Sequence, residues 1–206
     1  MTVSDYSRHD IASQFQVSLE KIEVVFNAPS SEYQPVEHLE QVQSQRDLLA
    51  KGNPYFIFVG SLHPRKNIPG LLAAFETYRS IGGVNDLVIV GESMWSDEMR
   101  NQHGVHFLGR MERKELATSV AASEGLVFIP WFEGFGVPIV EAFASGVPVI
   151  ASNRTSMPEV CGGAAAALLE PDDHDGIAKC MKKLENDAAF KNDAIKRGLA
   201  RASCFS

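Results

Sequence analysis

The sequence contains little that would build a covalent or metal-held framework. Its three cysteines, Cys161, Cys180 and Cys204, form no C-x-x-C pair, and no histidine stands at zinc-ligand spacing from them. An odd number of scattered cysteines is typical of chains that fold in a reducing compartment. We therefore expect all three cysteines to be structural or incidental.

Long apolar runs and an excess of positive charge are also lacking. No apolar run is long enough to cross a bilayer, and the polar residues 1–10 do not form a signal peptide. Acidic residues outnumber basic ones by 26 to 19, for a formal net charge of −7. This balance argues against DNA or RNA as the main partner, although a small phosphorylated ligand needs only one or two local cations. We expect a cytoplasmic protein, with contact at the inner face of the membrane left open for parts outside this sequence.

Short apolar runs alternate with amphipathic stretches along most of the chain. The near-continuous apolar runs indicate strands covered on both faces, and repeated strand–helix–strand order implies right-handed crossovers and a parallel sheet. The expected fold class is α/β, a Rossmann-like doubly wound parallel sheet with helices on both faces. Strands are expected at residues 22–26, 55–59, 87–90, 105–108, 126–129, 147–151 and 165–169, and helices at 36–49, 67–81, 97–101, 113–123, 138–144, 172–185 and 188–201.

The first fifty residues differ from the rest. They are polar, contain one expected strand, and end at the loop signal of residues 51–54. We interpret residues 1–50 as a lead-in segment and residues 51–206 as one ligand-binding domain. In doubly wound sheets the ligand lies beyond the carboxyl ends of the strands, so the loops after these strands are the candidate site.

The loop after residue 59 has the features of an anion site. Gly60 permits close backbone approach, and Arg65 and Lys66 place two cations where a helix is expected to begin. Asn67 is a favourable N-cap, and cations beside a helix N-terminus suit a diphosphate. A solvated basic turn explains the same residues equally well, and His63 is better explained as a surface histidine.

The loop of residues 130–141 is the most informative stretch. Gly134 and Gly136 let the backbone approach a ligand, and Pro138 suits the first turn of a helix. The backbone amides that would then be free to face a ligand are those of Phe135, Gly136, Val137 and Ile139.

Two carboxylates stand in this loop and in the helix that follows. Glu141 lies in the otherwise apolar residues 139–143, where a carboxylate is costly unless it has partners. The vicinal hydroxyls of a ribose would satisfy it, and Glu133 could accept from sugar hydroxyls. The alternative is that Glu141 is paired within the fold.

Four segments, taken in order, resemble the retaining glycosyltransferases of the GT-B fold, in particular the large family four (glycosyl transferases group 1). Each motif is weak alone, but the combination is specific, and the resemblance runs from about residue 17 to the end. The segments are residues 58–67, 105–109, the E-x7-E motif at 133–141, and 146–152 with 158–160.

The resemblance implies roles for the candidate residues. Lys66, helped by Arg65, would bind the donor diphosphate, Glu141 would hold the ribose, and Glu133 would hold the transferred sugar. Ser61 stands where many relatives carry an arginine, which weakens any charge role at that position. The other donor-binding residues that it implies are Gly60, Ser61, Leu108, Gly109, Arg110, Met111, Gly134, Phe135, Gly136, Val137, Pro138 and Ile139.

The implied activity is transfer of a hexosyl group, with a lean towards mannosyl, from a GDP- or UDP-linked sugar to a glycan or lipid-linked acceptor, with retention. We expect no cofactor and no metal, because no Asp-x-Asp motif looks able to hold one and the cations can stabilise the departing phosphate.

The family has two lobes. Residues 4–27 resemble the end of the first lobe with its crossover, and residues 198–206 resemble the start of the returning segment. We therefore expect a fragment or expressed domain that is inactive alone.

Three other interpretations stay open. The runner-up is a non-catalytic module that binds a nucleotide sugar. A dinucleotide oxidoreductase is disfavoured because no G-x-G-x-x-G follows the early strands. Epimerisation or glycogen-type synthesis would use the same fold, although residues 64–67 look more like bacterial polysaccharide or lipopolysaccharide mannosyltransferases. The donor sugar, base, acceptor and oligomeric state are not predicted.

Overall fold

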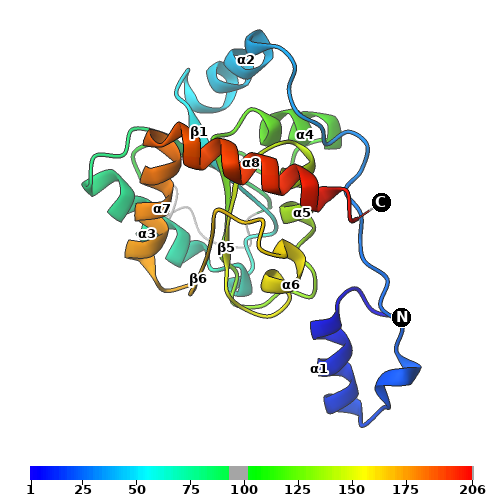
Figure 1. Ribbon diagram of the computed structural model, residues 1–206. Coiled ribbons are helices and arrows are strands. Elements are labelled where there is room, and N and C mark those ends of the chain that lie inside the picture. Colours follow the sequence, from blue (N-terminus) through cyan, green and yellow to red (C-terminus); the bar gives the residue numbers. More distant parts are fainter. Residues whose placement is uncertain (93–101, 206) are drawn as a thin grey trace.

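Six parallel strands form one sheet in the order β3-β2-β1-β4-β5-β6, which confirms the predicted doubly wound α/β class (Figure 1). A computed structural model of the chain describes residues 1–92 and 102–205, so the helix expected at 97–101 lies outside the described residues. The four central strands are buried along their whole length, whereas the edge strands β3 and β6 are partly exposed. The strands are β1 Tyr55–Val59, β2 Asp86–Val90, β3 Val105–Phe107, β4 Gly125–Phe128, β5 Val149–Ser152 and β6 Ala167–Leu169.

Helices cover both faces of the sheet, because the crossover from β1 runs towards one edge and the crossover from β4 towards the other. Helix α3 packs against α7, and α5 packs against α8, which lies across the front of the view in Figure 1. The helices are α1 Asp5–Phe15, α2 Leu39–Ala50, α3 Ile68–Ser80, α4 Arg113–Ala121, α5 Val137–Ala144, α6 Met157–Cys161, α7 His174–Asn186 and α8 Ala188–Ala202, with 3-10 turns η1 Leu19–Lys21 and η2 Pro64–Lys66.

The strand order reverses between β1 and β4. The loops that leave the carboxyl ends of these two strands therefore diverge over opposite faces and leave a crevice between them, where ligands of open α/β sheets bind. Both candidate loops of the sequence, at residues 60–67 and 130–141, begin at this point. The fold thus brings the two predicted anion- and sugar-binding loops together.

The N-terminal segment corrects the prediction for residues 22–26. Those residues form no strand of the sheet, and only Val24 makes an isolated parallel bridge, with Thr2. Residues 22–26 therefore do not pair with a strand of the six-stranded sheet. Phe26 instead packs against Phe135 and Phe205. The helix α1, which the sequence analysis did not predict, lies beside this segment at the edge of the domain in Figure 1.

Close contact between backbones joins the loops after β1, β2 and β3. The amide of Gly91 donates to the carbonyl of Gly109 at 2.7 Å, and the amide of Gly60 donates to the carbonyl of Val90 at 3.0 Å. A Cβ at Gly91 would lie 1.8 Å from the carbonyl oxygen of Gly60, and Gly91 has φ +155°. Only glycine allows these two loops to approach so closely.

No helix among the described residues is both long and apolar enough to span a membrane.

Candidate active site

The two cations of the β1 loop contact the first glutamate of the β4 loop. Arg65 Nη1 lies 2.7 Å from Glu133 Oε1, and Lys66 Nζ forms an ion pair with the same oxygen. Arg65 also donates to the carbonyl of Phe132 at 3.2 Å. The Lys66 ammonium lies 4.9 Å from the ring centre of Phe128, at the end of β4. Three predicted catalytic residues therefore meet in one cluster at the switch point of the sheet.

The local backbone explains why Lys66 faces inward. Pro64 begins the 3-10 turn η2, and Asn67 ends it in the left-handed conformation at φ 59°. Asn67 occupies the predicted N-cap position of α3, although its side chain makes no capping bond. The side-chain amide nitrogen of Asn67 instead donates to the carbonyls of Pro171 at 2.8 Å and Ile129 at 3.3 Å. These two bonds anchor the turn.

Burial lowers the pKa of Lys66. Its loss of solvent, together with the nearby Arg65 charge, lowers the pKa of the Lys66 ammonium to about 8. The carboxylate of Glu133 acts in the opposite direction, since an adjacent negative charge favours the charged ammonium. Lys66 is thus a cation near neutral pH that can lose its proton in the mildly alkaline range.

A pocket of about 310 Å³ lies beside this cluster, over the ends of β1 and β2. Gly60 lines the pocket and also lies next to the ion-pair cluster, since a Cβ at this position would be 3.7 Å from Lys66 Nζ. Four of the predicted donor-binding residues line the pocket, and Gly109 adjoins it through its bond to Gly91. The lining residues are Val59, Gly60, Ser61, Val90, Gly91, Glu92, Arg110, Met111 and Leu116.

Glu141, the second glutamate of the E-x7-E motif, has a partner that the sequence analysis missed. Burial raises the pKa of the Glu141 carboxyl to about 7, while a hydrogen bond with Tyr33 and the charge of Arg113 act to lower it. Tyr33 precedes α2 and is itself buried. The alternative of a pairing within the fold is therefore partly realised. A phenol so distant in sequence carries no local motif by which this pairing could be recognised.

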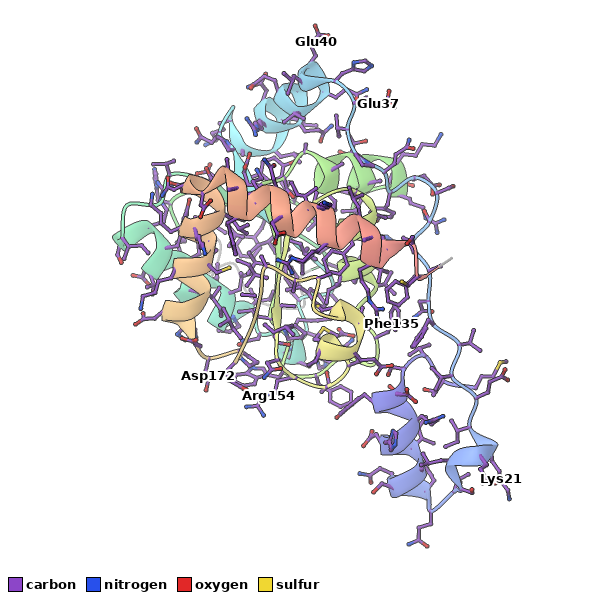
Figure 2. The ribbon with its side chains drawn as sticks, in the orientation of Figure 1. Lys21, Glu37, Glu40, Phe135, Arg154 and Asp172 are labelled. Atoms are coloured by element: carbon purple, nitrogen blue, oxygen red, sulfur yellow. The ribbon has the colours of Figure 1, made fainter. Side chains whose placement is uncertain are left out.

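The start of α5 follows the sequence prediction with one correction. Gly136 adopts φ +94° at the N-cap, and Pro138 lies in the first turn. The Ile139 amide, expected to be free, donates to the Gly136 carbonyl at 2.9 Å because the first turn closes on itself. Phe135 is buried and packs against Phe26 and Phe205, on the side of the domain where its label stands in Figure 2.

The backbone of Glu133 is held by residues from a third loop, which sequence reasoning also missed. The amide of Glu133 donates to Thr155 Oγ1 at 3.2 Å, and Ser156 Oγ donates to the carbonyl of Glu133 at 2.9 Å. Thr155 adopts φ 52°, an uncommon conformation for a β-branched residue. These contacts restrict the main chain that carries the carboxylate.

Comparison with known proteins identifies the family of this arrangement. The family model described as glycosyl transferases group 1 matches residues 40–201. The O-antigen chain mannosyltransferase B of Escherichia coli is 33% identical over 215 residues, which cover 100% of this chain and 56% of that protein. The MMP alpha-(1->4)-mannosyltransferase of Mycolicibacterium hassiacum is 29% identical over 89% of this chain and 44% of its own length. The chain thus spans about half the length of the curated relatives that it matches.

Solved structures share the fold at lower identity. Anabaena Alr3699/HepE in complex with UDP-glucose superposes with a TM-score of 0.84 at 20% identity, over 98% of this chain and 58% of that one. The C-terminal domain of a glycosyl transferase group 1 family protein (LpcC) from Francisella tularensis gives a TM-score of 0.73 at 20% identity, over 86% of this chain and 97% of that one. The chain belongs to the glycosyl transferases group 1 family and has the Rossmann-like fold found in GT-B glycosyltransferase structures.

Proposed function

We propose that this chain is the donor-binding domain of a retaining glycosyltransferase that moves a hexosyl group, in particular mannosyl, from a GDP- or UDP-linked sugar. The observation that supports it is the cluster of Arg65, Lys66 and Glu133 at the switch point, beside a pocket wide enough for part of a nucleotide. The pocket would take the base, the cations the diphosphate, and Glu133 with the turn at Gly136 the sugar. Relatives that are mannosyltransferases support the choice of sugar.

In the proposed reaction the bond between the anomeric carbon and the phosphate oxygen breaks, and its electron pair stays on the phosphate. A bond forms from the anomeric carbon to an acceptor hydroxyl oxygen, and the proton of that hydroxyl passes to the departing diphosphate or to water. Negative charge therefore grows on the departing diphosphate, where Lys66 and Arg65 would stabilise it. Glu133 carries a carboxylate suited to the positive charge that develops on the sugar ring.

We propose that the reaction needs no metal. In the Asp-x-Asp triplet of residues 173–175, Asp173 already caps α7 by accepting from the Gly176 amide at 2.9 Å. The acceptor, a glycan or lipid-linked glycan, would be bound by sequence outside this chain, at the cytoplasmic face of the membrane. This domain alone would bind the donor and transfer nothing.

The proposal is tested by calorimetric titration of the chain with GDP, UDP and ADP. One nucleotide should bind saturably, and its identity names the base. In the intact protein, transfer should continue in excess EDTA and give a product with the anomeric configuration of the donor. Donor binding without transfer by the intact protein would instead establish the non-catalytic module, and binding of no nucleotide would refute the assignment of these loops.

The affinity for a nucleotide sugar should follow a bell-shaped pH profile. Lys66, with a pKa of about 8, loses its positive charge as pH rises through 8, so affinity falls on the alkaline side. Glu141, with a pKa of about 7, becomes protonated as pH falls through 7 and then accepts ribose hydroxyls less well. Each limb should change the dissociation constant by at most about tenfold per pH unit, since one proton is linked to each.

Two substitutions assign the limbs of this profile. Glu141→Gln should remove the acidic limb, and Lys66→Arg should remove the alkaline one, because arginine stays charged. A nucleotide sugar is the suitable probe because both of its phosphates are diesters, which remain ionised throughout the range. A profile that keeps both limbs in both variants would show that other groups titrate in the site.

A further inference from the structure

Helix α1 contacts the domain at the loop that carries Glu133. Ser4, which is fully buried, accepts from the Ser7 amide at 3.0 Å and donates its hydroxyl to the carbonyl of Gly134 at 2.6 Å. Ser7 Oγ donates to the same carbonyl at 3.2 Å. Two hydroxyls at the start of α1 therefore hold the peptide between Gly134 and Phe135, the second peptide after Glu133.

Glu159 fixes this first turn from the other side. Its carboxylate accepts from the amides of Asp5 at 2.7 Å and Tyr6 at 3.0 Å. The first amides of a helix have no partner within the helix, and a carboxylate at that end is favourable both as an acceptor and through the helix dipole. No residue of α1 is buried, so these polar contacts largely determine how it is seated.

The same short helix, α6, joins both sets of contacts. Thr155 and Ser156 at its start hold the amide and the carbonyl of Glu133, and Glu159 within it holds α1. Tyr6 adds an edge contact to Phe132, with ring centres 6.0 Å apart. Three backbone groups of residues 133–134 are thus bound, namely the amide and carbonyl of Glu133 and the carbonyl of Gly134, and the last of them depends on where α1 sits.

We propose that Ser4, Ser7 and Glu159, which we call the α1 clasp, are positioning residues for the sugar of the donor. The clasp sets the orientation of the peptide between Gly134 and Phe135, and through it the amides that face the sugar and the main chain that carries the Glu133 carboxylate. Among the described residues, the hydrogen bonds of these three side chains reach the start of α1 and the Gly134 carbonyl, and none reaches Lys66 or a residue that lines the pocket. This inference rests on the proposed function, and it predicts a defect confined to recognition of the sugar.

The test compares a nucleotide sugar with its nucleoside diphosphate in calorimetric titrations of the chain: GDP-mannose against GDP, and UDP-glucose against UDP. Ser4→Gly removes the hydroxyl but keeps a residue that is tolerated at an N-cap. Glu159→Ala removes both bonds to α1, and Glu159→Gln keeps one acceptor oxygen. Matched controls are Ser18→Gly, at an N-cap whose side chain makes no capping bond, and Asp5→Asn, in the same turn of α1.

Ser4→Gly and Glu159→Ala should weaken binding of the nucleotide sugar by about tenfold, the effect of one or two lost hydrogen bonds, and should leave the nucleoside diphosphate within about twofold. Glu159→Gln should bind the nucleotide sugar with an affinity between those of Glu159→Ala and the wild type. Both control variants should bind both ligands as the wild type does. Equal losses for both ligands, or no loss for the sugar nucleotide, would overturn the clasp. If the wild type binds neither ligand, the proposed function itself fails, and the clasp with it.

Discussion

Replacing Lys66 by alanine should weaken the binding of a nucleoside diphosphate by about 100-fold, because truncating one partner of a desolvated charge pair has effects of this size. Lys66 is buried beside Glu133 and above the Phe128 ring, so its charge is poorly screened and would act strongly on a bound anion. Titration calorimetry of the variant and the wild type measures the change. Lys179→Ala, on an exposed face of α7, is the control for loss of one positive charge.

The Lys66 variant also leaves Glu133 with Arg65 as its remaining cation, and this could disturb the loop without any role for Lys66 in binding. The same substitution is therefore made in a Glu133→Gln background, where no buried carboxylate is left unpaired. If Lys66 contacts the diphosphate, the 100-fold loss persists in that background. If the loss disappears there, Lys66 serves to neutralise Glu133 and our assignment is wrong.

Replacing Gly91 by alanine should destabilise the domain by at least about 4 kcal/mol, the range reached when a side chain is forced into a packed backbone. The new Cβ would lie 1.8 Å from the carbonyl oxygen of Gly60, so the loops after β1 and β2 would have to separate. Those loops line the pocket that we propose takes the base of the nucleotide. Denaturant unfolding measures the loss, and soluble variant protein should also bind nucleotide poorly.

Gly82→Ala is the matched control for this clash. Gly82 has a positive φ of +83°, but a Cβ there would meet no atom within 4 Å. The free energy of unfolding should fall by about 1–2 kcal/mol in Gly82→Ala, which is the cost of the left-handed backbone alone. Similar losses in the two variants would show that the Gly60 loop moves aside easily and that steric contact does not set the loop spacing.

Much of the sheet could be predicted because its central strands are buried on both faces and therefore consist of nearly continuous apolar runs. Residues 55–59 and 86–90 are apolar runs or nearly so, and the structure buries every residue in them. Residues 22–26 show the same apolar character yet form no strand, since a strand also needs neighbours, which no local pattern reveals. Helix α1 was missed for the opposite reason. It has no buried residue, and its polar contacts come from residues distant in the sequence.

The site was predicted at the level of loops rather than of contacts. The rule that ligands lie at the carboxyl ends of parallel strands brought Lys66 and Glu133 to the same place. It could not show that they pair, because the two residues are 67 positions apart. Tyr33 against Glu141 and Ser4 against Gly134 are similar cases. Each joins an unremarkable residue of the lead-in segment to a motif residue, so only the folded chain reveals them.

The aromatic cluster around Phe135 bears on how this domain can be divided from its surroundings. Phe26 and Phe205, from near the two ends of the chain, both pack on Phe135, with ring centres 6.1 and 5.7 Å away. Two segments that are far apart in the sequence therefore meet on one ring, between the glycines at positions 134 and 136. A shortened form of this chain that lacks either phenylalanine should uncover part of the Phe135 ring and loosen the turn that contains it.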